Sequence, residues 1–538
     1  MNTARQQLRP LTSFVAPAAL AIVVAGMAAI MLASHRAGHW WGDDWALYLR
    51  QANGLLDGHP GRVIEENRFS VEMSRGAAFS PPLYPWGFPL ILAPFLAVLG
   101  DDIDRLTIVP VLSACVFACA WYALAKHRIG AVAALTGVVA ITLSPLLLGW
   151  TELIQSEWPF LAVTAVVLVG LDRAAASGTL TRLDAPWWPL ALLGGGAAAA
   201  FSVRREGIAM VAAIAAAQVA ALIATRAGRW WTKAAPRIRL TARLTLPHAA
   251  ALFVVGLLQV ALPSTLVPQY SGTSITNLWR FRTEHLEHLA EVIGLKRTWE
   301  PHPTIFDNAT LGWTAVGIYL LLALIGIVLA ATRHRRRDLH LVAYAIAALA
   351  VGGSFRVPIN RYLCTVAPVL LLLALVALQT LLPKRRIPVL PSAVAALALA
   401  AIVAGNLGNA HLRLERAAEF ADTNQTEWGP THPEALAMFE AVITLTDGDA
   451  VIAAPKARAM TFATERLSVQ FDDYRPMPTA VLPDLFVTEA DSDQADYLLA
   501  RPERFREVWR NRRFVLFQPS SAASAATNGA GSSSTASP

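Results

Sequence analysis

Two adjacent carboxylates, Asp43 and Asp44, follow the first apolar segment of the chain by only a few residues. A carboxylate at this depth is well placed to act on a lipid headgroup. The plainer alternative is the start of a solvated helix, because aspartate is favoured in a first turn and residues 45–56 have a helical composition. Both interpretations place the pair at a membrane boundary.

A second acidic site lies in the short segment 151–157, whose only charged residues are Glu152 and Glu157. A carboxylate close to a bilayer is energetically costly, so such a residue is a functional candidate by default. The alternative is a simple helix cap, in which Ser156 and Glu157 begin the next helix.

Arginines form a third group, because they interrupt apolar stretches at two turns. Arg204 and Arg205 precede Glu206 at one turn, and Arg356 and Arg361 lie at the other. The planar guanidinium group binds phosphate through two parallel hydrogen bonds, so these residues predict contact with a lipid phosphate. An internal ion pair with Glu206 is the alternative for the first turn.

A histidine and glutamate cluster occurs at residues 284–288, in the order Glu-His-Leu-Glu-His. Histidines three residues apart on a helix can bind a metal ion. We interpret this cluster instead as the solvated face of a helix, which is the commoner origin of such a pattern.

The elements that position these residues are membrane spans. The 538 residues are 55% hydrophobic and 15% charged, with a mean hydropathy of +0.45, and many apolar runs reach the roughly 18 residues that indicate a spanning helix. The net charge of +7 comes from short basic clusters between these runs, so nucleic-acid binding is not indicated. The predicted spans are 11–34, 106–125, 129–148, 158–171, 187–203, 208–224, 246–266, 311–331, 339–353, 363–382 and 387–404.

The basic clusters also predict the orientation of the chain, because lysine and arginine accumulate on the cytoplasmic side. They place the N-terminus in the cytoplasm if the proline-punctuated segment 83–99 lies beside the membrane instead of crossing it. The outer face then receives the segments 35–82, 151–157, 267–310 and 355–361, together with the C-terminal domain.

The fold class is therefore an all-α polytopic membrane protein of about eleven spans with a small extracytoplasmic α/β domain. We predict a transmembrane catalytic domain at 1–408, an α/β domain at 409–519 and a disordered Ser/Ala-rich tail at 520–538. In the α/β domain we expect helices at 433–445 and 456–464, a strand at 450–454, and strands near Tyr497 and Val515.

Six short elements follow one another along the chain: Asp43-Asp44 with Tyr48, Pro81 to Pro85 around Tyr84, Ser144-Pro145, Arg204 to Gly207, Arg361-Tyr-Leu with Pro368, and Ala454 to Arg458 with Glu465-Arg466. In this order they resemble the motifs of the GT-C superfamily of membrane glycosyltransferases, in the branch that contains protein O-mannosyltransferases, aminoarabinose transferases and RgtA/B/C/D-like enzymes. The match covers most of the chain. The second acid of the pair is commonly Glu in that family, and Asp often stands where this chain has Glu157.

The resemblance implies an inverting transfer of a sugar from a polyprenyl-phosphate donor to a hydroxyl of an envelope glycan, lipid or protein, on the outer face of the bacterial cytoplasmic membrane. It implies that Asp43 is the base, supported by Asp44, and leaves Glu157 as an orienting residue, an acceptor ligand or a metal ligand. Some relatives bind a divalent cation and others need none. The implied phosphate ligands are Arg204, Arg205, Arg356 and Arg361, and the implied substrate-loop residues are Tyr48, Tyr84 and Glu152.

Two other classes of protein are compatible with many apolar segments. A transporter or flippase of lipid-linked saccharides would carry polar residues at the bilayer midplane, often in repeated halves, and the predicted spans are nearly free of charge. A sensor that binds a ligand in its outer domain would not account for the acidic residues in the loops.

Overall fold

The computed structural model describes residues 2–74, 83–224, 234–262, 276–277, 283–296, 309–333, 335–355, 359–383, 389–471 and 482–520. The chain divides into two compact units, and each contains segments that are distant in the sequence. Unit 1 comprises Met1–His35, Thr107–Val260 and Gly272–Glu419, and unit 2 comprises Arg36–Leu106, Ala261–Ser271 and Phe420–Pro538.

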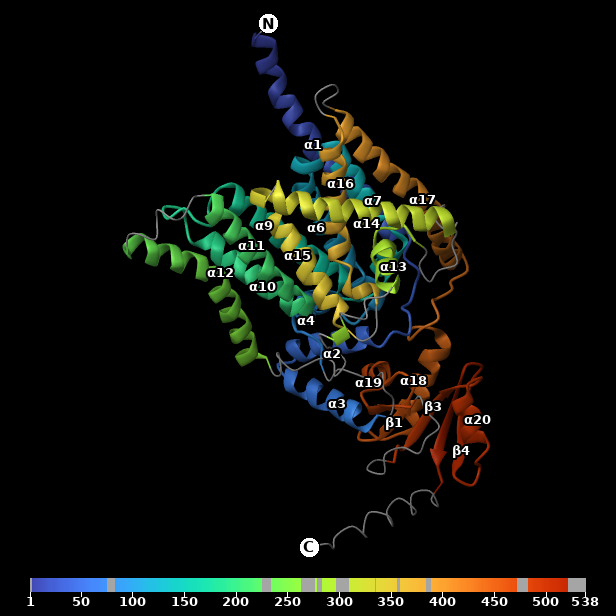
Figure 1. The fold of residues 1–538 in the computed structure, drawn as a ribbon. Coiled ribbons are helices and arrows are strands. Elements are labelled where there is room, and N and C mark those ends of the chain that lie inside the picture. Colours follow the sequence, from blue (N-terminus) through green and yellow to red (C-terminus); the bar gives the residue numbers. More distant parts are fainter. Residues whose placement is uncertain are drawn as a thin grey trace. The chain divides into compact units, whose positions relative to one another are not determined.

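Unit 1 is a bundle of apolar helices (Figure 1). Where the predicted spans lie in the described residues, each falls on a helix, except that span 129–148 is the bent pair α7 (Ala131–Thr142) and α8 (Pro145–Gly149). Residues 263–266 and 387–388 of two predicted spans lie outside the described residues. The helices are α1 (Asn2–Ala33), α6 (Ile108–Ile129), α7 (Ala131–Thr142), α8 (Pro145–Gly149), α9 (Glu157–Ala176), α10 (Trp188–Val203), α11 (Ala209–Ala224), α12 (Ala234–Ala261), α13 (Thr283–Val292), α14 (Ala309–Thr332), α15 (Arg335–Gly353), α16 (Val366–Leu381) and α17 (Leu390–Asp422, which continues into unit 2).

Helix length decides how many of these elements can cross a bilayer alone. Within the described residues, 7 helices are long and apolar enough, or up to 8 when α7 and α8 are taken as one broken span. Helices α10 and α16 have 16 residues each, which at 1.5 Å per residue is less than the roughly 30 Å hydrocarbon core. The protein is thus a multi-pass membrane protein whose shorter helices pack against longer ones.

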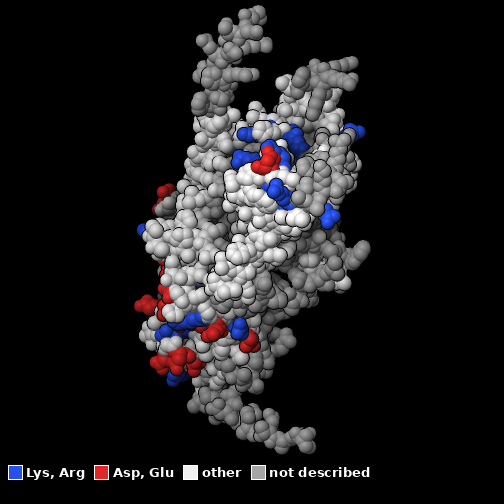
Figure 2. Space-filling view, turned by 90° about the vertical axis from the view of Figure 1, so that its left-hand side faces the viewer, with Lys and Arg blue, Asp and Glu red and all other residues white. Residues whose placement is uncertain are grey.

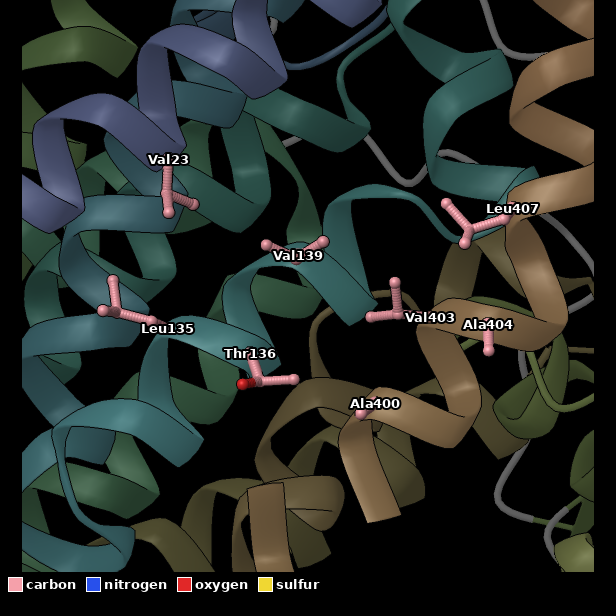
Figure 3. Close-up of a pocket in the computed structure, with 8 residues that line it drawn as sticks. All are labelled: Val23, Leu135, Thr136, Val139, Ala400, Val403, Ala404 and Leu407. Atoms are coloured by element: carbon pink, nitrogen blue, oxygen red, sulfur yellow. The ribbon is translucent and has the colours of Figure 1, made fainter. Parts of the chain in front are cut away.

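The surface of the bundle supports this assignment. Large apolar side chains such as Leu252, Phe253 and Val260 are exposed, and Figure 2 shows wide areas without Lys, Arg, Asp or Glu. Such a surface is stable in lipid and would aggregate in water. Between α1, α7 and α17 the surface forms an apolar groove of about 320 Å³, lined by residues that include Val23 and Leu407 (Figure 3).

Unit 2 combines the first helices after α1 with the C-terminal residues. The unit contains α2 (Asp44–Leu56), α3 (Pro60–Met73), α4 (Gly87–Leu99), α5 (Ile103–Leu106), α18 (Pro433–Leu445), α19 (Ala457–Thr464) and α20 (Asp493–Leu499). Helix α2 packs against both α4 and α19, and α3 packs against the strand β2 (Leu467–Gln470). The α4 helix has 13 residues and contains Pro94, so it is too short to span a bilayer, as the prolines in this segment predict.

The sheet of unit 2 has five strands in the order β2-β1-β3-β5-β4. Strand β1 is parallel to β2 and β3, whereas β5 is antiparallel to β3 and β4. The strands are β1 (Val451–Ala454), β2 (Leu467–Gln470), β3 (Leu485–Glu489), β4 (Phe505–Arg510) and β5 (Phe514–Pro519).

Both faces of this sheet are covered. On one face Ile452, Leu485 and Leu516 pack against α18 and α19, and on the other Ala453 and Phe486 pack against neighbours that include the partly buried Phe69 of α3. A parallel strand that is buried on both faces reads as a continuous apolar run, as in Val451–Ala454. The segment after the first span thus belongs to the core of the α/β unit.

Two sequence predictions for this unit are wrong or incomplete. The segment around Tyr497 is the helix α20, not a strand, because the Ser492 hydroxyl accepts from the Ala495 amide and caps it at 3.3 Å. Strands β2, β3 and β4 were not predicted. The helix at 433–445, the strand near 450–454, the helix near 456–464 and the strand around Val515 are confirmed.

Candidate functional site

The acidic pair begins helix α2 of unit 2, in agreement with the predicted helix at 45–56. Asp43 precedes the helix and Asp44 is its first residue. The next residues, Trp45 and Tyr48, are buried, so the helix is fixed in the unit and its N-terminal end holds the carboxylates in place. The pair is therefore only half-exposed, unlike the first turn of a solvated helix.

Asp44 is held by Tyr84 and by an arginine of the C-terminal segment. The Tyr84 hydroxyl donates to Asp44 Oδ1 at 2.5 Å, and Arg458 Nη1 donates to the Tyr84 oxygen at 3.1 Å. The Arg458 Nη1 atom also lies 3.9 Å from Asp44 Oδ1. The Nε atom of Arg458 donates to Asn67 Oδ1 at 3.3 Å. Burial raises the pKa of Tyr84 well above its ordinary value, and the Asp44 charge adds to that effect, so the phenol stays protonated.

Asp43 faces the beginning of α19 instead. Its Oδ1 accepts a hydrogen bond of 3.2 Å from the backbone N–H of Ala459, in the first turn of that helix. Burial raises the pKa of Asp43 above its ordinary value, while Arg458 and Lys456 offset part of the rise. A carboxylate with a raised pKa is a stronger base than an ordinary aspartate.

Tyr48 supports this arrangement by packing. Its ring lies 4.6 Å from the ring of Tyr84 and 4.8 Å from that of Phe88, measured between centroids. Gln51, one turn further along α2, exchanges two hydrogen bonds with the backbone of Tyr84. The Asp-Asp-x-x-x-Tyr spacing therefore serves to orient Tyr84 toward Asp44.

In unit 1, Glu157 and the first arginine turn form one buried cluster. Arg204 Nη1 donates to Glu157 Oε1 at 2.6 Å, and its Nη2 donates to Glu206 at 2.9 Å. The Ser156 hydroxyl accepts from Arg204 at 3.2 Å. The internal ion pair with Glu206, noted as the alternative for this turn, is therefore present, and Arg204 also binds Glu157.

Gly207 explains why the chain can turn here. Residues Arg205–Ile208 form a short 3-10 helix that folds back on α10, and a Cβ at Gly207 would lie 2.3 Å from the backbone carbon of Ala200. Only glycine leaves room for this approach. The Arg-x-Glu-Gly element is therefore a packing requirement as well as a set of charges.

Arg361 joins the same cluster from a distant part of the sequence. Its Nε donates to Glu157 Oε1, and its side chain is 25% exposed compared with 10% for Arg204 and 0% for Glu157. The second oxygen of Glu157 has no hydrogen-bond partner among the described residues. Arg205 packs over the ring of Phe201, and Arg356 lies outside the described residues.

Glu152 takes part in a different buried pair. Arg413 of α17 donates to Glu152 Oε1 at 2.7 Å, and both side chains are buried. A buried pair of this kind costs desolvation and is maintained only when it is well bonded, which Asn409 and the carbonyl of Pro145 provide. Glu152 therefore packs into the bundle instead of lining an open loop.

Sequence reasoning assigned no site role to two arginines of these sites. Arg458 was noted only as the end of the family element Ala454 to Arg458, and Arg413 lay in no predicted helix or strand, so only their tertiary partners distinguish them. The cluster at 284–288 lies on α13, and its solvated-face interpretation is wrong for His285, which is buried. Glu291, also buried, bonds His288 at 2.9 Å. Among the described residues, no group of three or more His, Cys, Asp or Glu is placed to hold a metal ion.

A multi-pass helical bundle combined with a small α/β unit is the GT-C fold that the motifs predict, and solved structures confirm it. The structure of ArnT from Cupriavidus metallidurans bound to undecaprenyl phosphate aligns with 94% of this chain and 98% of its own, at 15% identity and a TM-score of 0.51. Its apo form aligns with 96% and 99%, at 14% identity and a TM-score of 0.52.

The apo oligosaccharyltransferase from Archaeoglobus fulgidus is also similar, at 12% identity and a TM-score of 0.47, over 89% of this chain and 70% of its own. Neither a protein-family profile nor a curated protein sequence matches the chain. The likeness to ArnT therefore shows a shared fold.

Proposed function

We propose that the protein is a glycosyltransferase that moves a sugar from a polyprenyl-phosphate donor to an acceptor hydroxyl. The observation that carries this proposal is the environment of Asp43, a half-buried carboxylate of raised pKa on a fold shared with an ArnT that binds undecaprenyl phosphate. The other proposed features are inversion at the anomeric carbon, an envelope glycan, lipid or protein as acceptor, and a location on the outer face of the bacterial cytoplasmic membrane with the N-terminus in the cytoplasm.

In this mechanism Asp43 accepts the proton of the acceptor hydroxyl as that oxygen attacks the anomeric carbon. The bond from the anomeric carbon to the phosphate oxygen breaks, and the polyprenyl phosphate leaves with the electron pair. Asp43 Oδ1 is held by the Ala459 amide, and its Oδ2 accepts no hydrogen bond from the described residues. One oxygen of the carboxylate is therefore fixed and the other is available for the acceptor proton.

The leaving phosphate needs positive charge, and we assign this role to Arg361 with Arg205. Arg204 is shared between two carboxylates, so its charge is already compensated within the protein. Arg361 is the more exposed of the two arginines that bind Glu157. A donor phosphate can replace Glu157 as the partner of Arg361 while Arg204 stays buried. In this assignment Glu157 is an orienting residue that positions the arginines that bind the phosphate. Arg356 keeps its sequence-based assignment to the same phosphate.

A flippase of lipid-linked saccharides is the competing function. It would move the donor across the membrane without breaking the bond to phosphate, so it has no need for a carboxylate held ready as a base. One experiment separates the two: undecaprenyl-phosphate donors with radiolabelled sugars are incubated with the protein in nanodiscs and with envelope extracts as acceptors. Release of free undecaprenyl phosphate together with labelled acceptor supports transfer, and an intact donor with every sugar contradicts it.

The Asp43→Asn variant makes the assay specific to the proposed base. Asparagine retains the hydrogen bond from Ala459 but cannot take a proton, so turnover should fall by roughly 10² to 10⁴-fold. Asp57→Asn is the matched control, because Asp57 is an exposed residue at the other end of the same helix. Equal turnover in the two variants would remove Asp43 from the mechanism.

A further inference from the structure

The two adjacent aspartates have different partners, although their sequence environments are nearly the same. Asp44 is bonded by Tyr84 and faces Arg458, whereas Asp43 is bonded by a backbone amide. Two carboxylates this close would repel each other if both were ionised, and one of them would tend to keep a proton. The surroundings of the two carboxylates must therefore determine which of them stays ionised.

The first turn of α19 contains groups that give the two carboxylates different surroundings. Arg458 is buried and makes hydrogen bonds to Tyr84 and Asn67, so its guanidinium is held in one position. The next residue, Ala459, donates its amide to Asp43. These two consecutive residues thus act on different members of the pair. Arg458 places a full positive charge near Asp44 and is linked to it through the Tyr84 hydroxyl, whereas Ala459 donates a neutral amide to Asp43.

We propose that Arg458 is a positioning residue that assigns separate roles to the two aspartates. Together with Tyr84 it holds Asp44 as a permanent anion and leaves Asp43 as the only carboxylate of the pair that exchanges a proton. This inference rests on the proposed function and deepens it, because it makes the α/β unit part of the machinery that prepares the base.

The charges around Asp43 agree with this division. The charged groups that act on it are Arg458 of α19, Lys456 just before that helix and the adjacent Asp44, and the two cations lower a pKa that burial raises. Removal of Arg458 should therefore raise the pKa of Asp43 further, and should also free Asp44 to take up a proton. Neither effect follows if Arg458 only helps α19 to pack.

Carbodiimide labelling tests this division without relying on transfer activity. Dicyclohexylcarbodiimide adds to protonated carboxylic acids in apolar surroundings, and mass spectrometry of the peptide locates the adduct. In the full-length wild-type protein in detergent, Asp43 should label with a pH midpoint above that of an ordinary aspartate, and Asp44 should not label. In Arg458→Met the Asp43 midpoint should rise by about one pH unit or more, and label should appear on Asp44.

Two further variants distinguish positioning from a structural role. Arg458→Lys retains the positive charge but lacks the planar guanidinium fork. The pH midpoint of Asp43 labelling should therefore stay close to the wild-type value, whereas Asp44 should become partly labelled. Arg501→Met removes an arginine of the same unit whose side chain, within the described residues, bonds the segment around Tyr497 alone, and it should leave both aspartates unchanged.

Tyr84→Phe provides a second route if Arg458→Met does not fold. It removes only the hydroxyl between Arg458 and Asp44, so Asp44 should become labelled. Equal labelling of the two aspartates in the wild type, or no labelling of Asp44 in a folded Tyr84→Phe protein, would overturn the proposal. Failure of every donor in the transfer assay would instead contradict the glycosyltransferase function, and the labelling pattern would still be measured.

Discussion

Arg204 and Arg361 donate hydrogen bonds to the same oxygen of Glu157, although the two arginines are 157 positions apart in the sequence (361 − 204). Arg204 has a second carboxylate, Glu206, at 2.9 Å, and its side chain is less exposed than that of Arg361. The two arginines therefore have different electrostatic surroundings. This asymmetry leads to different expectations for two substitutions that the sequence alone treats as equivalent.

Arg361→Ala should weaken the use of a polyprenyl-phosphate donor. A charge-assisted hydrogen bond contributes about 1.5 to 3 kcal/mol, so donor affinity or kcat/KM should fall roughly ten-fold or more. Arg361→Lys should recover only part of this loss, because an ammonium group lacks the planar fork. The measurement is the dependence of transfer on donor concentration, and Arg182→Ala, which removes an exposed arginine of unit 1, is the control.

Arg204→Ala should instead destabilise the protein. It leaves Glu157 and Glu206 buried with less compensation, and breaking one side of a buried pair typically costs about 3 to 5 kcal/mol. The apparent melting temperature in detergent should fall clearly, whereas Arg361→Ala should change it less. A stable Arg204→Ala protein with a selective loss of donor binding would show that Arg204 is a phosphate ligand after all.

Gly207→Ala tests the backbone turn that presents these arginines. An added Cβ would meet the backbone of Ala200 and Phe201 within 2.4 Å, and backbone atoms cannot move aside as a flexible side chain can. Gly195→Ala is the matched control in α10, because a Cβ there meets nothing within 4 Å and alanine favours helix. The melting temperature should fall for Gly207→Ala and stay the same or rise for Gly195→Ala; a similar response of both would argue against the close approach.

Arg128 should be among the most important residues for the stability of unit 1. Its buried guanidinium bonds Asp338 at 2.7 Å and Asp172 at 2.5 Å, and so joins α6, α15 and α9. Arg128→Gln should cost about 3 to 5 kcal/mol, because two carboxylates lose their cation. The exposed pair of Arg182 and Asp184 is the reference, since solvent screens it and Arg182→Gln should change the melting temperature far less. Thermal melting of both variants in the same detergent makes the comparison.

Much of the architecture could be predicted because local patterns determine it. Long apolar runs predict spans regardless of their neighbours, and Asp44–Leu56 and Pro433–Leu445 carry helical periodicity within their own residues. The helix α20 was missed because seven residues give little periodicity, although Ser492 followed by acidic residues is a capping signal. Strands β2 and β3 have four and five residues, which is too short to distinguish from loops by sequence.

The site was predicted in its residue types but not in its partnerships. Arg458 and Tyr84 are 374 positions apart, and no local pattern relates one to the other. The same holds for Arg413 and Glu152, which lie 261 positions apart. Sequence reasoning found the carboxylates because charges near a bilayer are rare, whereas arginines in polar helices give no such contrast.

Asp43→Asn should make the protein more stable and less active at neutral pH. An acid whose pKa is raised on folding binds its proton more tightly in the folded state, so folding becomes less favourable as the pH rises from the unfolded toward the folded pKa. Above the folded pKa the ionised carboxylate therefore lowers the free energy of unfolding. Asparagine removes this cost, and the melting temperature at pH 7 should rise relative to the wild type.

The gain in stability should diminish as the pH is lowered through the folded pKa of Asp43, because the wild-type carboxyl then becomes neutral as well. The acid limb of the wild-type transfer profile should follow the same pKa, above the range of an ordinary aspartate, since only the ionised form accepts a proton. Asp44→Asn is the control with the opposite expectation: it weakens the bond with Tyr84 and the attraction to Arg458, so it should lower the melting temperature. Near-normal turnover of Asp43→Asn with an inactive, folded Asp44→Asn would move the base to Asp44, and activity in both variants would rule out a base at this pair.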